Sequence, residues 1–366
     1  MIRGVTVIVA AGLWVAAAVL LWRTTVPAGL RLPHVDPHAL LGARDLTRAA
    51  AQERFLRWDW VAATLAQLAA LGWLAWRPPR APAAVLAAVA LLAAWAAGIP
   101  FALAAQWWEN HYGLAHGGYG VVVDTSVLFA IALGCLAIAA LVAVAARIGR
   151  AWWLVATPLL VGAAALLLLV SPLLMTGLRP LGHGVYVQTV SGSTSEANAE
   201  AVGLGPTRRI VLWDTLLDGR FSHAEVGFVV AHERTHLRRD HLLKGLAWFG
   251  LLAALGTFVI SRLVRLEAPG AVPKALLLAF ALQLALLPFT NAVSRRYEAE
   301  ADWGALQRTR DPAADRALMR DFARTSLEQP DPPGWSYVFL DNHPTPLQRV
   351  ELAQAFSRYR ASRAGS

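Results

Sequence analysis

Two histidines and a glutamate lie close together in the segment His232-Glu233-Arg234-Thr235-His236. On a helix, positions i and i+4 project from the same face one turn apart, so the two imidazoles can bind one zinc ion. The Glu233 carboxylate, next to the first His, can then act as general base on a zinc-activated water. The alternative is a helix whose two His face a polar cavity. The segment therefore predicts a bound metal ion, a hydrolytic reaction and the residue that acts as its general base.

A third zinc ligand is expected from a later segment, because catalytic zinc usually takes three protein ligands and leaves one position for water. Glu298 and Asp302 are four residues apart and share a face if their segment is helical. Glu298 can bind zinc, and Asp302 can orient a ligand His as an acceptor, while Glu300 points elsewhere. The alternative is a charged helix with a solvated face. His241 would lie about 140° round a continuous helix from His236, so we expect it beside the site or on the surface.

Composition places these residues in a membrane protein. The chain is 57% hydrophobic and 16% charged, with a mean hydropathy of +0.47. Its apolar residues form blocks of about 18 to 25 residues, long enough to span a bilayer. The seven candidate spans lie near 4–22, 59–76, 82–106, 125–146, 151–174, 246–263 and 275–293. Cys135 is the only cysteine, which excludes an intrachain disulfide.

The spans determine which polar segments can meet. Two spans separate the candidate zinc helix from the tail 294–366, so the chain returns to the same side and Glu298 can reach the zinc. That side also carries most of the 33 Lys and Arg, which predicts that the active site is cytoplasmic. The Ala- and Arg-rich composition looks bacterial, which predicts a plasma-membrane location. The net charge of +9 reflects Arg beside the spans, and no nucleic-acid partner is expected.

The polar loop 175–245 is expected to carry a small sheet. Residues 185–190 and 208–213 are rich in β-branched and aromatic residues and predict two strands. Ser222 with Glu225 predicts a capping box at the start of the zinc helix. A sheet edge beside that helix could bind an extended peptide, and the alternative is a packed hairpin without a ligand. We therefore expect two domains, a membrane region of five spans over 1–174 and a peptidase domain over 175–366 that includes two further spans.

Several separated motifs resemble one protein family. His232 to His241 looks like HExxHxxxxH, and the segment 294–302 is similar to SRRxExxAD. Residues 343–349 look like an HPxxxxR motif, and 209–217 resemble a strand and turn that reads RIVLxDTLL. Together these residues resemble the M48 zinc metallopeptidases, in particular the integral-membrane branch called CAAX prenyl protease 1. The resemblance implies a mainly α, polytopic membrane protein, in which about seven transmembrane helices form a chamber.

The resemblance also implies roles for individual residues. The three ligands of a single zinc ion would be His232, His236 and Glu298, with Glu233 as the base. His343 would sit near the scissile carbonyl, where a fixed donor can stabilise the oxyanion. For His343 and Arg349 the alternative is a contact that anchors their loop. Asn198 falls on the substrate-binding edge strand of the family. Two residues later this chain has Glu200 in place of an aromatic residue, which changes a substrate contact rather than the chemistry.

The function that we expect is zinc-dependent endoproteolysis in the membrane. The substrate would be a CAAX-type, lipidated or membrane-associated peptide or protein, met at the lipid bilayer. One alternative is a protease for membrane-protein quality control. Another is a zinc-binding receptor or scaffold without catalysis, which predicts loss of the base or of a ligand. A transporter would carry ionisable residues within its spans, and these spans have almost none.

Overall fold

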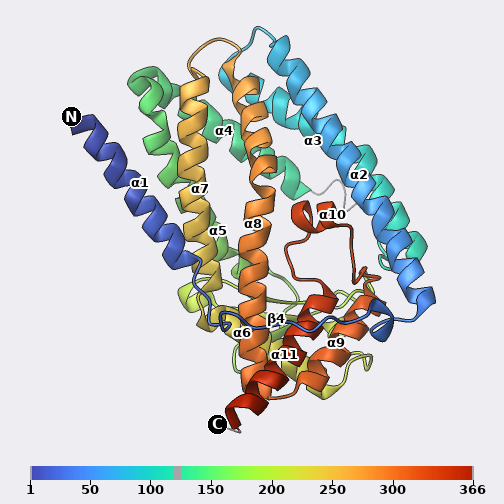
Figure 1. The fold of residues 1–366 in the computed structure, drawn as a ribbon. Coiled ribbons are helices and arrows are strands. Elements are labelled where there is room, and N and C mark those ends of the chain that lie inside the picture. Colours follow the sequence, from blue (N-terminus) through green and yellow to red (C-terminus); the bar gives the residue numbers. More distant parts are fainter. Residues whose placement is uncertain (1, 119–124, 365–366) are drawn as a thin grey trace.

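Long helices and a short, mixed sheet make up the chain. The computed structural model describes residues 2–118 and 125–364. Figure 1 shows the long helices running side by side from the sheet towards the far end of the molecule, where the N-terminus lies. These helices are α1 (Ile2–Leu21), α2 (Ala43–Trp76), α3 (Ala83–Tyr112), α4 (Thr125–Ile148), α5 (Trp153–Leu174), α7 (His241–Leu263) and α8 (Ala271–Thr309).

Each of the seven predicted spans coincides with one of these helices. By length and apolar composition, the described residues contain four stretches that could cross a membrane. One of them, Leu128–Leu174, holds α5 and most of α4, and the other three are α3, α7 and α8. A shorter apolar helix covers Val9–Leu21. The expectation of a mainly helical, polytopic protein with a small sheet is confirmed.

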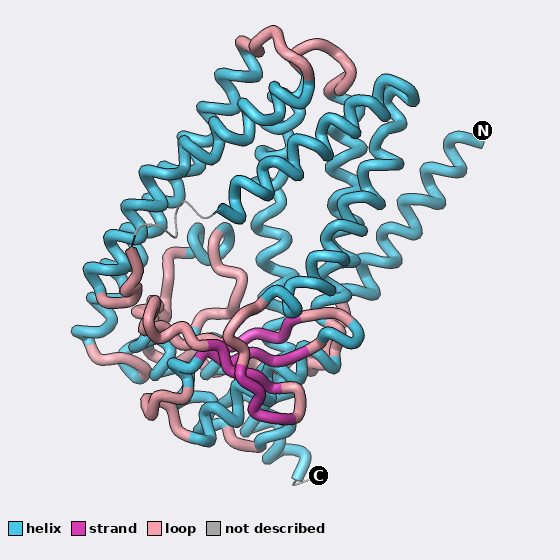
Figure 2. Tube along the Cα trace, turned by 180° about the vertical axis from the view of Figure 1, so that it is seen from behind, coloured by secondary structure: helices cyan, strands magenta, loops and turns pink. Residues whose placement is uncertain are grey.

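The sheet has four strands, β1 (Arg179–Gly182), β2 (Val185–Gln188), β3 (Ala199–Val202) and β4 (Arg209–Trp213), in the order β1-β2-β4-β3. The predicted strands correspond to β2 and β4, which pair in parallel and so do not form a hairpin. The reason is that the chain between them forms β3, which pairs antiparallel with the other side of β4. This order leaves β3 at one edge of the sheet (Figure 2).

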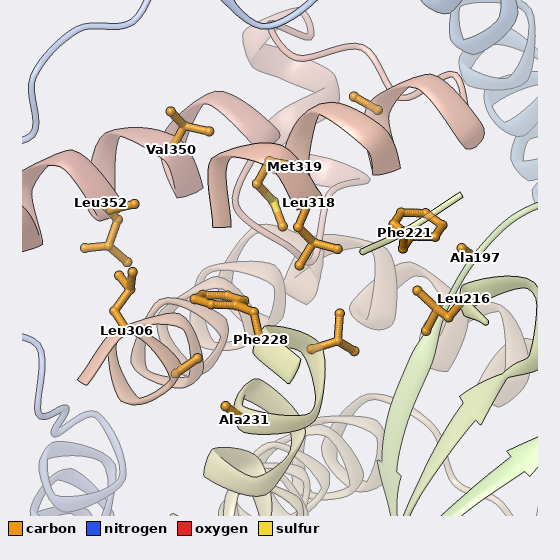
Figure 3. Packing of buried hydrophobic residues seen from close by; sticks show 14 of the residues in the cluster. Ala197, Leu216, Phe221, Phe228, Ala231, Leu306, Leu318, Met319, Val350 and Leu352 are labelled. Carbon is orange, nitrogen blue, oxygen red and sulfur yellow. The ribbon is translucent and has the colours of Figure 1, made fainter. Parts of the chain in front are cut away.

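Helix α6 (His223–Arg238) carries the HExxH segment, and its predicted capping box is present. Ser222 Oγ accepts a hydrogen bond from Glu225 N, and Ser222 N donates to the Glu225 carboxylate at 2.7 Å. These two bonds satisfy backbone groups that a helix N-terminus otherwise leaves open. Phe228 on α6 is fully buried among Leu216, Leu306 and Leu318 (Figure 3), so α6 is fixed at the centre of the core.

The remaining helices bring distant segments onto α6. They are α9 (Pro312–Thr325), α10 (Gly334–Phe339) and α11 (Pro346–Ala364). Helix α8 is continuous over 39 residues, and its charged end packs against α6. Helix α11 packs against α8 and α9 (Figure 1), and Arg349 in its first turn reaches within 3.5 Å of His232 on α6. Residues from three separate parts of the sequence therefore meet around one helix.

Candidate metal centre

Three side chains of types that commonly bind metals converge between α6 and α8. His232, His236 and Glu298 offer ligand atoms that all lie within 4.8 Å of one another. The Nε2 atoms of the two His are 3.0 Å apart, and Glu298 Oε2 is 3.2 Å from His232 Nε2. His236 Nε2 lies 3.5 Å from Glu298 Oε1. His232 and Glu298 are buried and His236 is half-buried, so the group could hold a metal ion at the base of a cavity.

Asp302 and Arg349 hold His232 from behind. Asp302 Oδ1 lies 2.8 Å from His232 Nδ1, and Arg349 donates to both oxygens of Asp302, at 2.9 and 2.6 Å. An ionised carboxylate only accepts, so His232 donates from Nδ1, and Nε2 is the ring atom that faces the cluster and that a metal ion would bind in place of a proton. Burial lowers the pKa of His232, but the negative charges of Asp302 and Glu298 outweigh burial and raise it to about 10. The cluster therefore favours a positive charge at its centre.

Arg349 lines the cavity at the cluster and is at the same time the ion-pair partner of Asp302. Its side chain is largely buried, and Asp302 raises the pKa of the guanidinium above its ordinary value against the effect of burial. Asp315 on α9 is also buried nearby, and neither of its oxygens has a hydrogen-bond partner among the described residues. Burial and the charge of Asp302 raise the pKa of the Asp315 carboxyl well above its usual range. The pair of Arg349 and Asp302 thus keeps the local charge balanced.

His241 contacts His236 because the helix does not continue between them. Helix α6 ends at Arg238, Asp240 adopts a left-handed φ of 53°, and α7 begins at His241. The angle expected for a continuous helix is therefore wrong. The break turns His241 back, so that its Nδ1 lies 3.0 Å from His236 Nδ1. Glu300, which points away from the cluster as predicted, lies 3.2 Å from His241 Nε2, a partner that the sequence did not indicate.

A cavity of about 320 Å³ opens in front of the cluster. Glu233, Asn198 and His343 all line this cavity, together with the three candidate ligands and Glu200. Glu233 is buried on α6. His343 Nε2 lies 3.5 Å from Glu298 Oε2, and its Nδ1 is 2.7 Å from Asn342 Oδ1. The structure therefore brings every site residue predicted from the sequence to one place, with Asp302 behind the ligands.

Two further cavities share lining residues with the first one at the proposed ligands and at His343. The larger, of about 560 Å³, is lined mainly by apolar side chains of α5, α7 and α8 and shares His236 and Glu298 with the first cavity. The other, of about 490 Å³, lies between α2, α8 and α10 and shares His343. Glu328 lines this second cavity, where burial and then the charge of Glu53 raise the pKa of its carboxyl to about 7. The candidate centre therefore adjoins one cavity with several charged side chains and one that is mainly apolar.

Comparisons with known proteins agree with this geometry. The model of peptidase family M48 matches residues 176–357. A Bacillus subtilis protein described as "Uncharacterized metalloprotease YhfN" is 35% identical over 189 residues, which cover 48% of this chain. The match spans 44% of that relative, less than half of its length. The crystal structure of S. mikatae Ste24p shares the fold, with a TM-score of 0.68, 16% identity and coverage of 94% of this chain and 96% of that one.

Proposed function

We propose that this chain, whose residues 176–357 form a domain of peptidase family M48, is a membrane-embedded zinc endopeptidase. Its ligands to one Zn²⁺ would be His232, His236 and Glu298, in a peptidase unit that covers 175–366. The observation that carries the proposal is the convergence of these three donors within 4.8 Å at the base of a cavity. Glu233, the proposed base, also lines that cavity.

The donor set fits a zinc ion. Ligand atoms about 2.0–2.2 Å from a tetrahedral Zn²⁺ lie roughly 3.3–3.5 Å from each other. The three closest separations between the donors are 3.0, 3.2 and 3.5 Å, so a small movement would admit the ion. Two imidazoles and one carboxylate are also a ligand set of known catalytic zinc sites. When bound, zinc would lower the pKa of a water and polarise the substrate carbonyl.

The residues of the chain would move the protons. Glu233 would accept the proton of the attacking water and pass it to the leaving nitrogen. Because Glu233 is next to His232 on α6, one helix fixes the distance between the base and the metal. His343 reaches the same cavity from the loop before α11 and would donate a hydrogen bond to the developing oxyanion. Asp302, with Arg349 behind it, would keep His232 in the tautomer that binds metal.

We infer that the substrate is a peptide with an apolar anchor. Residues of β3 and Asn198 line the cavity, so an extended peptide could lie along that edge of the sheet. The apolar cavity formed by α5, α7 and α8 adjoins the same ligands and could accept a lipid chain or an apolar side chain. A CAAX-type, lipidated or membrane-associated peptide has this combination. The apolar cavity also favours a second candidate, cleavage of membrane proteins in quality control. In either case we propose a cytoplasmic active site in a bacterial plasma membrane.

The test uses the full chain in detergent or in liposomes, with zinc content and peptide cleavage measured on the same samples. We expect the wild type to hold one zinc and to cleave a fluorogenic peptide that carries an apolar anchor. The Glu233→Gln variant should hold the same zinc and lose cleavage by at least about a hundredfold, as expected on removal of a general base. Equal cleavage by the two proteins would overturn the role of Glu233, and absence of bound zinc in both would overturn the metal site.

A further inference from the structure

A second imidazole stands behind His236 and links it to a buried carboxylate. His241 Nδ1 lies 3.0 Å from His236 Nδ1, and His241 Nε2 lies 3.2 Å from Glu300 Oε2. The His241 ring is buried and stacks on Tyr297, with the ring centres 4.7 Å apart and 9° between the planes. Glu300 is 2% exposed. The three side chains His236, His241 and Glu300 are thus held in line by packing as well as by hydrogen bonds.

The acceptor character of Glu300 fixes the protons along this line. An ionised carboxylate cannot donate, so His241 carries its proton on Nε2 and presents a lone pair at Nδ1. His236 then donates from its Nδ1, and its Nε2 lone pair faces His232 and Glu298. His232 also donates from its Nδ1, in this case directly to Asp302. A carboxylate therefore determines that each of the two His donates from Nδ1. Asp302 acts on His232 directly, and Glu300 acts on His236 through the imidazole of His241.

Glu300 is itself fixed by the segment that follows the first helix. Glu300 Oε1 accepts hydrogen bonds from Thr25 N at 3.1 Å and from Thr25 Oγ1 at 2.8 Å, across 275 residues of sequence. Tyr297, which stacks on His241, donates from its hydroxyl to the Leu21 carbonyl at the end of α1. Trp248 donates to the same hydroxyl at 3.0 Å. The end of α1 therefore contacts both the carboxylate and the aromatic ring that position His241.

We propose that Glu300 and His241 are positioning residues for His236, and that Thr25 locks them when the end of α1 is docked. The inference rests on the proposed zinc site, because it assigns these residues to the orientation of one zinc ligand. Its consequence is that the first membrane helix, far from the cluster in sequence, contributes to metal affinity. A merely structural role for the same contacts would change thermal stability and leave the affinity of the folded protein for zinc unchanged.

The decisive variant is Glu300→Gln, made in the Glu233→Gln background so that catalysis plays no part. The two Thr25 donors keep the amide oxygen on their side, so the amide nitrogen faces His241 and donates to its Nε2. The His241 proton then moves to Nδ1 and opposes the Nδ1 proton of His236. We expect zinc affinity, measured by competition with a chelator, to fall about tenfold to a hundredfold, as for other partners of metal ligands.

The matched control is Glu351→Gln in the same background. Glu351 on α11 also fixes the N-terminal segment, since it accepts a hydrogen bond from Val35 N at 3.1 Å, but it does not contact the cluster or His241. We expect its zinc affinity to equal that of the parent. The absorption spectrum of the Co²⁺-loaded proteins gives a second readout, because a changed ligand orientation alters the spectrum of Glu300→Gln and not that of Glu351→Gln.

Substitutions of Thr25 keep the test informative if Glu300→Gln does not fold. Thr25→Val retains the shape and the backbone donor but loses the hydroxyl, and we expect a smaller loss of zinc affinity, about threefold to tenfold. Thr25→Ser restores the hydroxyl and should restore the affinity. Unchanged zinc affinity in the folded Glu300→Gln variant, or in Thr25→Val when the former does not fold, would overturn the proposal. Absence of zinc from the parent would instead overturn the zinc site, and zinc binding without cleavage by the wild type would overturn catalysis alone.

Discussion

Gly304 on α8 faces Thr235 on α6 so closely that a Cβ at position 304 would lie 2.5 Å from Thr235 Cγ2. Only a residue without a side chain permits this approach. The contact lies two residues beyond Asp302, at the level where α8 delivers its carboxylates to the His of α6. The separation of the two helices at this point therefore determines whether the metal-binding atoms can meet.

Gly304→Ala should push α8 away from α6. We expect a loss of about 1–3 kcal/mol in the free energy of unfolding, as for other overpacked contacts, together with lower zinc content. Thermal unfolding in detergent and metal analysis measure the two effects. Gly227→Ala is the matched control, because a Cβ at that exposed position of α6 meets nothing within 4 Å. Equal stability and zinc content in the two variants would contradict the close contact.

Arg349→Met should destabilise the protein strongly. Removal of the guanidinium leaves Asp302 buried with a single partner, and breaking a buried ion pair in this way costs about 3–5 kcal/mol. Arg358→Met, at an exposed position of the same helix, should change the free energy of unfolding by less than about 0.5 kcal/mol. The comparison of unfolding midpoints at pH 7 tests the prediction, and similar midpoints for both variants would show that Arg349 is not needed to balance Asp302.

The pKa of Glu328 predicts a pH-dependent stability. The pKa of a Glu carboxyl is ordinarily 4.5, and burial raises the pKa of Glu328 to about 7 in the folded protein, so the folded state binds the proton more tightly than the unfolded state. Stability contributed by the neutral form is fully present below about pH 4.5 and is lost as the pH rises through 7. Glu328→Gln should therefore raise the free energy of unfolding by up to about 3 kcal/mol at pH 8 and change little at pH 4.5.

The control for this pH dependence is Glu267→Gln, an exposed carboxylate in the turn before α8. Its effect on the unfolding midpoint should be small at both pH values. If Glu328→Gln gave the same shift at pH 8 as at pH 4.5, the carboxyl of Glu328 would titrate normally in the folded protein.

Glu200 should select substrates by charge. Burial and the neighbouring charge of Glu233 raise the pKa of the Glu200 carboxyl. A cationic group of the substrate beside Glu200 would offset the repulsion between the two carboxylates and would therefore be bound favourably. In a set of peptides that differ at one position, we expect Lys or Arg to be preferred over Gln near the scissile bond by about threefold to fivefold in kcat/KM, as for a partly exposed ion pair. Glu200→Gln should remove the preference and leave cleavage of uncharged peptides intact. A preference that survives in Glu200→Gln would assign it to another residue.

The four-residue spacing of the two His, and the even number of predicted spans between them and Glu298, were enough to predict that these three side chains meet. His232 and His236 share a helix face, and the two long helices α7 and α8 bring Glu298 back to the end of the molecule where α6 lies. His241 lies beside the cluster, one of the two places expected for it, but its direct contact with His236 was not predicted because the helix was assumed to continue, whereas Asp240 breaks it at a left-handed φ of 53°. The partner of Glu300 could not be predicted, since Thr25 is 275 residues away and its hydroxyl carries no sequence signal. Strands β1 and β3 lack the β-branched pattern that indicated β2 and β4.

Helix α8 connects an apolar stretch that could span a membrane with Glu298 of the candidate metal centre. It is continuous over 39 residues, Ala271–Thr309. Its first 28 residues lead from the apolar stretch to Glu298, a length of about 42 Å at the usual rise per residue. A bilayer that is too thick or too thin for the apolar part changes the tilt of a membrane helix. Pro288 lacks the backbone donor for the carbonyl of Leu284, which puts the most easily bent turn of the helix ten residues before Glu298. If α8 spans a bilayer as proposed, the acyl-chain length of the lipid would therefore change the position of Glu298, a proposed ligand of the metal, through the tilt of this helix.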